Sequence, residues 1–308
     1  MMGTPTFFVS GAAGGLQGST GFRVTQLLRE QGHAVRALVH RLDERSDRVR
    51  ALGAEVVEGD LHDPRCLTDA MAGVRRAYFA YPVQEGLLQA AATFAVAARS
   101  AGVEQVVNLS QWLQPSGEQP TPHQTRHWLV ENIFDWAGVG AVHLNAVVFY
   151  ENLKTWAQLS LDRAGVIAMP WGPETTKIPL VAAEDVAAVA AASLCGPVLP
   201  NGTVVRLMGA GVANSDIAEA FSDVLGRSVR YVEITDEQWA DRVRGVTGAN
   251  AVAVEHLVHL WRYLRTRPPE YQAFYLASEA FEHFLGRKPK SLPEFLNDHR
   301  DLFAEAAK

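Results

Sequence analysis

The sequence predicts a doubly wound α/β fold: a parallel sheet covered by helices on both faces, followed by a smaller α+β lobe. Three observations predict it. Short apolar runs alternate with amphipathic helical stretches through the first half of the chain, which is typical of βαβ units. A glycine-rich turn joins the first apolar run to the first helical stretch. After about residue 150 the alternation loosens, and prolines follow at Pro170, Pro173 and Pro179.

The first half contains six apolar runs that predict the strands of one parallel sheet. They cover residues 6–10, 34–39, 55–58, 76–80, 105–109 and 141–148. Helical spacing of apolar residues lies between them, in residues 20–31, 64–72, 87–101 and 125–136. Ligands of such sheets bind beyond the carboxyl ends of the strands, so the residues after each run are candidates for a site.

The chain after residue 150 is expected to form the smaller lobe. Residues 179–194 predict a short strand and a helix, and residues 203–209 predict another strand. From residue 215 onward the pattern is mostly helical, with one strand near Arg230. We therefore expect a sheet domain at 1–150 and a mostly helical substrate lobe at 151–308, formed with returning segments and closing a cleft at the carboxyl edge of the sheet.

The glycine-rich stretch 11–18, GAAGGLQG, follows the first strand and opens the first helix. Backbone amides and the helix dipole favour a pyrophosphate there, and glycines allow its close approach. The spacing GxxGxxxG is not a common dinucleotide fingerprint, so a flexible turn is the alternative, but the context favours nucleotide binding. The candidate cofactor-binding residues of this loop are Gly11, Ala12, Gly14, Gly15, Leu16, Gln17 and Gly18.

The composition argues against several classes of function. The 308 residues carry a formal net charge of −6, and the basic residues are spread along the chain, which predicts no nucleic-acid surface. No apolar run reaches the roughly 18 residues of a membrane span, and residues 1–6 lack a secretory signal, so we expect a cytoplasmic protein. Cys66 and Cys195 form no CxxC motif, which predicts neither disulfides nor a metal site. The expected partner is a small molecule, and the chain is expected to be a monomer or homodimer.

Several segments resemble one known family. GAAGGLQGST from Gly11 is similar to the GATGxQG loop of the NmrA-like atypical short-chain dehydrogenases, lengthened by one residue. Further segments follow in the order of that family: HAVRALVHR from His33, GDLHD from Gly59, VVNLSQW from Val106, FYENL from Phe149 and VAAEDVAAVAAASL from Val181. The resemblance runs from about residue 5 to about residue 300. It implies that 1–150 is an NAD(P)-binding Rossmann domain.

The resemblance also implies which strand ends touch the cofactor. Asp60 and Leu61 after the third strand would flank the adenine, whereas Asp60 as the cap of the next helix is the alternative. Ala80, Tyr81 and Pro82 after the fourth strand would line the ribose path.

The end of the second strand favours NADP(H) over NAD(H). An NAD site usually places a carboxylate there for the ribose 2′-hydroxyl, whereas basic residues accommodate a 2′-phosphate. This strand runs into His40 and Arg41, with Arg45 nearby and Asp43 as the first acid. The alternative is that HRLDERSDR is simply the solvated start of a helix.

The usual catalytic pair of the wider superfamily, YxxxK on the helix after the fifth strand, has no counterpart at the expected place. The literal match that starts at Tyr150 follows the sixth strand and is interpreted as a coincidence. At the expected place the sequence reads HQTRH, from His123 to His127.

This HxxxH pair has three interpretations: a metal pair, two surface histidines, or substitutes for the catalytic pair. A metal site would need a third ligand, which no nearby pattern provides. By resemblance, His127 replaces the lysine that contacts the nicotinamide ribose, four residues before Glu131, and His123 takes the tyrosine position. Either imidazole would then supply a proton near neutral pH.

Ser110 matches the superfamily serine that hydrogen-bonds a substrate oxygen, although a serine at a strand end is as often a turn residue. Trp112, Tyr81, Tyr150 and Trp171 would wall a site for a flat, conjugated substrate, or would be packing residues. The candidate catalytic residues are His127, His123, Ser110 and Tyr150.

Three functions follow from this pattern. The favoured one is an NADPH-dependent reductase of a quinone or a conjugated or aromatic carbonyl compound, because such acceptors need little help from a strong acid. The second is a non-catalytic sensor, in which NADP(H) occupancy changes the surface shown to a protein partner. The third is a non-redox isomerase that keeps the dinucleotide bound.

Overall fold

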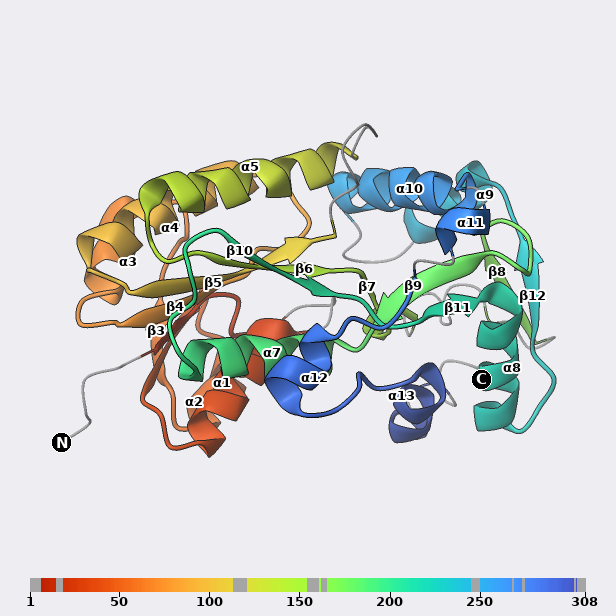
Figure 1. Cartoon of the computed structure of the whole chain (residues 1–308), viewed down its shortest axis with the longest axis horizontal. Helices are drawn as coiled ribbons and strands as arrows, with labels where there is room; N and C mark the ends of the chain where they lie inside the picture. The colour runs from red at the N-terminus through yellow and green to blue at the C-terminus, as the bar shows by residue number, and fades with distance from the viewer. Residues whose placement is uncertain are drawn as a thin grey trace. The chain divides into compact units, whose positions relative to one another are not determined.

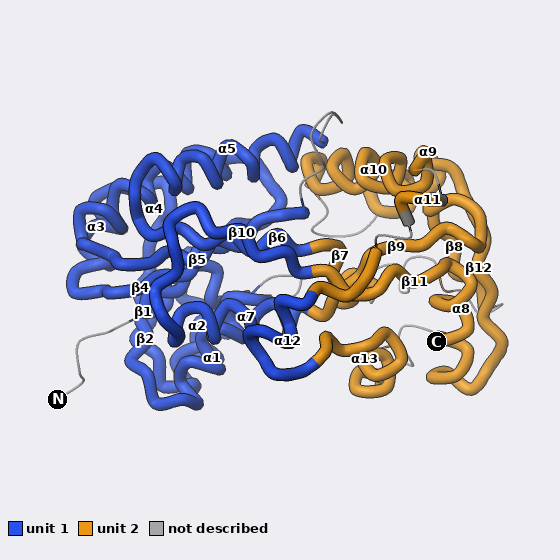
Figure 2. Tube along the Cα trace, in the orientation of Figure 1, with its two compact units in different colours: residues 1–146, 183–207, 279–287 blue, residues 147–182, 208–278, 288–308 orange. Residues whose placement is uncertain are grey.

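The chain divides into two units of different architecture (Figure 2). The first comprises 1–146, 183–207 and 279–287, and the second comprises 147–182, 208–278 and 288–308. The computed structural model describes residues 7–14, 19–112, 121–153, 161, 165–244, 250–267, 269–272, 275–301 and 303.

Seven parallel strands form the sheet of the first unit, in the order β10-β6-β5-β4-β1-β2-β3 (Figure 1). They are β1 (Phe7–Val9), β2 (Val35–Val39), β3 (Glu55–Glu58), β4 (Arg76–Phe79), β5 (Gln105–Gln111), β6 (Val142–Ala146) and β10 (Thr203–Leu207). The chain crosses from the β1–β3 side to the β4–β6 side, so the doubly wound prediction is confirmed.

Helices cover both faces of this sheet, α3, α4 and α5 on one and α1, α2, α7 and α12 on the other (Figure 1). Their bounds are α1 (Thr20–Glu30), α2 (Glu44–Ala51), α3 (Pro64–Ala70), α4 (Leu87–Ser100), α5 (Pro122–Ala137), α7 (Ala183–Cys195) and α12 (Ala280–Leu285). The five inner strands are mostly buried, which explains why apolar residues dominate them, whereas the edge strands β3 and β10 keep exposed positions.

Four phenylalanines hold the α4 and α5 layer to the sheet. Phe79 on β4 meets Phe94 of α4 at 4.9 Å and Phe134 of α5 at 5.2 Å between ring centroids. Phe8 on β1 meets Phe94 at 5.9 Å. All four side chains are fully buried, so they fix the two helices beside the strands whose ends carry candidate site residues.

Two differences from the sequence-based expectation concern the border between the first unit and the second. Residues 141–148 were expected to form one strand, but Val147 separates β6 from β7 (Val148–Phe149), which pairs with β9 in the second unit. The strand at Thr203–Leu207 and the helix at Ala183–Cys195 were assigned to the second lobe, yet they belong to the first unit. The reason is non-local: β10 pairs with β6, and α7 packs on α1, where Glu184 contacts Arg23 at 3.4 Å.

The second unit contains two small sheets and several helices. One sheet has the order β11-β9-β7 and the other pairs β12 with β8. The strands not yet given are β8 (Val166–Met169), β9 (Lys177–Val181), β11 (Gly211–Ala213) and β12 (Arg230–Glu233). The helices are α8 (Asn214–Leu225), α9 (Asp236–Arg244), α10 (Ala251–Arg265), α11 (Pro269–Gln272) and α13 (Leu292–Asp298). Among the described residues of the whole chain, no helix has the length and apolarity that crossing a membrane requires.

Candidate functional site

The turn after β1 is tied to the end of β4. The Ser10 hydroxyl donates a hydrogen bond to the Ala80 carbonyl at 3.2 Å and accepts one from the Ala80 amide at 3.0 Å. Gly11 and Gly14 have φ values of 67° and 75°, which few other residues adopt, and the Gly14 amide donates to the Gly11 carbonyl. Gly15, Leu16, Gln17 and Gly18 lie outside the described residues. Ser10 thus brings the glycine turn beside Ala80, a predicted ribose neighbour.

The start of α1 lies directly against this turn. A Cβ atom added to Gly21 would lie 2.6 Å from the Gly11 carbonyl oxygen and 2.7 Å from that of Ser10. Only a glycine therefore lets the helix begin this close to the strand. This is the geometry that places helix-terminal amides at a phosphate, and the sequence reasoning did not single out Gly21.

The end of β2 leaves one arginine available to a ligand. Asp43 caps α2, and both Nε and Nη2 of Arg45 donate to its carboxylate, at 3.0 and 2.6 Å. His40 and Arg41 are exposed, and Arg41 makes no hydrogen bond or ion pair with another described residue. Asp43 and Arg45 therefore fit the interpretation of HRLDERSDR as the solvated start of a helix. Arg41 precedes the helix cap and takes no part in it.

The residues after β3 form a local turn. The Asp60 carboxylate accepts hydrogen bonds from the backbone N–H and from Nδ1 of His62, each at 2.9 Å. The hydrogen bond from the backbone N–H holds the pKa of Asp60 below its usual value. The alternative that Asp60 caps the next helix is wrong, because Asp63 caps α3. Leu61 is half-buried and packs against the core beside the sheet.

Tyr81, after β4, is fixed in the loop that precedes α4. Its hydroxyl donates to the Glu85 carbonyl at 2.9 Å and lies 3.3 Å from His62 Nε2, and partial burial raises its pKa. Pro82 is exposed. A link between the β3 and β4 ends therefore runs through His62, which the sequence reasoning missed.

The end of β5 is joined to the start of α5. Thr121 caps α5 in a capping box with Gln124, and Gln124 Nε2 donates to the Trp112 carbonyl at 2.8 Å. The Trp112 amide donates to Ala146 at the end of β6. The first turns of α5, which carry both candidate histidines, are thereby fixed to the carboxyl edge of the sheet.

His123 and His127 lie together, one turn apart on α5. Their rings meet edge to face with centroids 4.9 Å apart, and both side chains are buried. Burial, assisted by Arg126, lowers the pKa of His123 to about 4. A neutral imidazole argues against His123 as the group that supplies a proton near neutral pH, and its catalytic role stays a prediction.

A buried glutamate, not a candidate in the sequence reasoning, lies one further turn along α5. Glu131 Oε1 accepts a hydrogen bond of 2.6 Å from Asn145 Nδ2 on β6, and Asn145 is the register partner of Ser110 on β5. The Ser110 hydroxyl lies close enough to the Glu131 carboxyl to lower its pKa, but burial outweighs this and leaves that pKa raised. The helical step of four from His127 was the available sequence signal.

Two of the predicted aromatic residues belong to the second unit and are packing residues there. Tyr150 is 2% exposed, and its ring lies 5.2 Å from that of Phe295. Trp171 is 1% exposed and meets Trp261 edge to face at 5.5 Å. Their burial favours the packing interpretation over a wall that faces a substrate.

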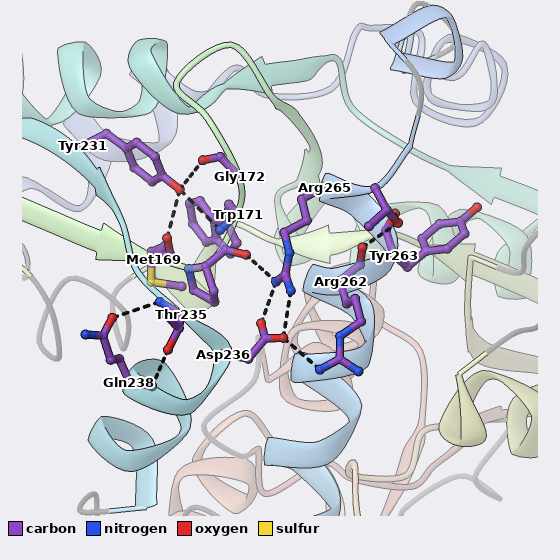
Figure 3. Close-up of polar contacts among 12 residues, drawn as sticks. Met169, Trp171, Gly172, Tyr231, Thr235, Asp236, Gln238, Arg262, Tyr263 and Arg265 are labelled. Atoms are coloured by element: carbon purple, nitrogen blue, oxygen red, sulfur yellow. Dashed lines mark hydrogen bonds and ion pairs between the residues drawn. The ribbon is translucent and has the colours of Figure 1, made fainter.

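The second unit also contains a polar cluster around Asp236 (Figure 3). Arg265 donates to both carboxylate oxygens of Asp236, Arg262 donates to one of them, and Arg265 also donates to the Pro170 carbonyl. Nearby, the Tyr231 hydroxyl donates to the carbonyl of Met169, the last residue of β8, and to that of Gly172 in the following loop. These groups satisfy one another, which assigns them to the scaffold of this unit.

Residues 4–285 match the NmrA-like family. The chain belongs to this family. NAD(P)H azoreductase from Xenophilus azovorans is 29% identical to this NmrA-like chain over 291 residues, which cover 94% of the chain and 97% of the azoreductase.

Solved structures show the same fold. The NADPH-dependent quinone oxidoreductase QOR2 of Escherichia coli, in complex with NADPH, superimposes with a TM-score of 0.79 at 20% identity, covering 96% of this chain and 99% of the other. NmrA, a negative transcriptional regulator in complex with NAD, has a TM-score of 0.76 at 17% identity, covering 98% of each chain.

Proposed function

We propose that this NmrA-like chain is an NADPH-dependent reductase of quinones or of conjugated and aromatic carbonyl compounds. The observation that carries the proposal is its similarity, over nearly the full length of both chains, to a protein named NAD(P)H azoreductase. The quinone oxidoreductase with the same fold supports the same kind of acceptor.

The residues of the first unit fit a dinucleotide. The glycine turn is tied to β4 by Ser10, and Gly21 lets the first helix approach it, which together make a cradle for a pyrophosphate. Exposed Arg41 at the end of β2 suits a 2′-phosphate, because the first carboxylate after it is occupied by Arg45. Asp60 and Tyr81, each fixed by hydrogen bonds at its strand end, would border the adenosine part.

When bound, the reduced nicotinamide would supply the two electrons of the reaction as a hydride equivalent. The chain itself must then deliver one proton and orient the acceptor. Ser110 is the candidate donor, and His127 the candidate contact to the cofactor ribose. A quinone or conjugated ketone suits this set, because its reduced anion is stabilised by conjugation and needs only a weak acid.

An anaerobic titration with NADPH, followed by a panel of quinones and conjugated enones, tests the proposal. We expect loss of the reduced-nicotinamide absorbance that requires both protein and acceptor, and that is slower with Ser110→Ala. Histidine at position 283, exposed and on α12, provides the matched control His283→Ala, which should keep the wild-type rate. NADPH binding without oxidation by any acceptor would contradict a reductase.

A redox sensor is the second candidate, favoured by the structural likeness to the regulator NmrA. A sensor binds its partner protein with different affinities in the NADPH and NADP⁺ states. By linkage, the partner protein then changes the relative affinities for NADPH and NADP⁺ by the same factor. Pull-down from a lysate with the protein saturated by each form tests this. Equal capture in both states would exclude redox control of the contact.

A further inference from the structure

The buried polar groups at the junction of β5, β6 and α5 form one contiguous set. Asn145 Nδ2 donates to Glu131 Oε1 at 2.6 Å, and Ser110 sits opposite Asn145 in the sheet register. All three residues are buried: Asn145 is 5% exposed, Glu131 is 6% exposed and Ser110 is 2% exposed. A carboxyl group is therefore held out of water directly behind the serine at the carboxyl edge of the sheet.

The Ser110 hydroxyl is not used by the scaffold. The Glu131 carboxyl is its hydrogen-bonding neighbour and has its pKa lowered by this contact, and no other partner for the hydroxyl lies among the described residues. A buried hydroxyl whose neighbour is an ionisable carboxyl rather than a backbone group is placed to exchange a proton with it. Its proton remains available to an oxygen placed at the strand end.

A buried carboxyl group is also energetically unfavourable if its role is only to hold Asn145 in place. A glutamine would accept the same hydrogen bond from Asn145 without the cost of burying an ionisable group. What a glutamine lacks is an acidic proton. Of these two side chains, only the glutamate can therefore exchange a proton at this position.

We propose that Glu131 is the proton reservoir of the site. It does not touch the acceptor itself and acts by returning a proton to Ser110. This inference rests on the proposed reductase function. As the acceptor gains its electrons, the Ser110 O–H bond breaks and an O–H bond forms on the acceptor oxygen. The Glu131 O–H bond breaks in turn and restores the Ser110 hydroxyl. Glu131 is left as a carboxylate that still accepts from Asn145, and solvent returns its proton between turnovers.

The charged groups around Glu131 are consistent with this role. His143 on β6 favours the carboxylate and Asp135, one turn further along α5, opposes it, whereas burial raises the pKa of Glu131 most. His143 is itself engaged, since its ring lies 3.0 Å from Asp135 and 3.1 Å from Asn108. His127 is one turn earlier on the same helix. Ser110 and Asn145 are the neutral neighbours on the two strands.

Infrared difference spectroscopy tests the relay without requiring turnover. With NADPH present, wild-type protein should show the carbonyl band of a protonated carboxyl, and this band should disappear as the pH is raised through the pKa of Glu131, above that of an exposed glutamate. Glu131→Gln should remove this band. Glu104→Gln should keep it, because Glu104 is an exposed glutamate paired with Arg75 at the start of β5. Ser110→Ala should shift the band, and Ser110→Thr should restore its position. The relay would be overturned if Glu131→Gln kept the band, or if Ser110→Ala left the position of the band unchanged.

Turnover provides the second arm. The rate of acceptor reduction in wild type should fall as the pH rises through the pKa of Glu131, whereas Glu131→Gln should be about 10- to 100-fold slower with a flat profile and an unchanged NADPH affinity. Equal rates for wild type and Glu131→Gln at every pH would reject the relay while leaving the reductase intact. If wild type reduces no acceptor, the proposed function fails, and the infrared bands alone decide whether Glu131 and Ser110 share a proton.

Discussion

The imidazole rings of His123 and His127 meet edge to face inside the first unit, with their centroids 4.9 Å apart. Burial and the nearby Arg126 keep His123 neutral by lowering its pKa to about 4, whereas an unfolded chain would titrate near 6.5. Between these values the unfolded chain binds a proton that the folded chain does not. The stability that His123 contributes is therefore complete above about pH 6.5 and is lost as the pH falls toward 4.

We expect His123→Gln to lose less stability than wild type between pH 6.5 and pH 4, by up to about 3 kcal/mol. Urea unfolding at several pH values measures this difference. His283→Gln, at an exposed position on α12, should follow the wild-type curve. Parallel curves for wild type and His123→Gln would show that folding does not change the pKa of His123.

The hydrogen bond from Asn145 to Glu131 should matter more at high pH. The Asn145 amide lowers the pKa of Glu131, which means that it stabilises the ionised carboxyl. We expect Asn145→Ala to destabilise the fold by about 1–3 kcal/mol, with the larger value at pH 8 and the smaller at pH 5. Thermal unfolding at both pH values checks the trend. Asn132→Ala should show no such trend, because the Asn132 amide donates to the Trp128 carbonyl of the same helix and to no other described residue. A pH-independent loss in Asn145→Ala would contradict the prediction.

The contact between α1 and the glycine turn predicts a reversal of the usual helix preference. Alanine in place of a helical glycine normally stabilises by about 1 kcal/mol. At Gly21 the added methyl would overlap the backbone of Ser10 and Gly11, so Gly21→Ala should instead destabilise by about 1–3 kcal/mol and weaken NADPH binding. Gly102→Ala places a methyl in open space after α4; its φ of 71° makes this variant a control for NADPH affinity, which should stay unchanged, and not for stability. Unaltered stability and affinity in Gly21→Ala would show that the turn can move aside.

Much of the first unit could be predicted from local patterns. The helix expected from residue 87 begins at Leu87, and β3 has the expected bounds, because each is set by its own apolar residues and turns. The position of β10 could not be predicted in this way. Its own residues only indicate a strand, and its place beside β6 depends on a pairing across some sixty residues of intervening chain.

The candidate site was predicted less completely for the same physical reason. The Asp63-Pro64 pair was a readable signal for the cap of α3, and it would have excluded Asp60 from that role. The pairing of Glu131 with Asn145 joins a helix to a strand and has no signature in either segment alone. The depressed pKa of His123 depends on burial by residues distant in sequence.

The two arginines that bind Asp236 in the second unit should contribute unequally. Arg265 donates two hydrogen bonds to this carboxylate and is mostly buried, whereas Arg262 donates one and its side chain is 55% exposed. We expect Arg265→Ala to lower the free energy of unfolding by about 2–3 kcal/mol and Arg262→Ala by less than about 1 kcal/mol. Urea unfolding followed by tryptophan fluorescence compares them. Equal losses would mean that solvent screens both pairs alike.

Arg41 and Arg45 make a matched pair for the cofactor preference. Both follow β2, but Arg45 is held by Asp43 at 2.6 Å, whereas Arg41 has no such partner among the described residues. We expect Arg41→Ala to weaken NADPH binding about tenfold and to leave NADH binding unchanged, because only NADPH carries the 2′-phosphate. Arg45→Ala should change neither affinity by more than about twofold, since it removes a cation already neutralised by its neighbour. Fluorescence titration of both cofactors gives the ratio. If Arg41→Ala leaves the NADPH-to-NADH ratio at the wild-type value, the phosphate is bound elsewhere; if Arg45→Ala alone changes it, the Asp43 pair opens on binding.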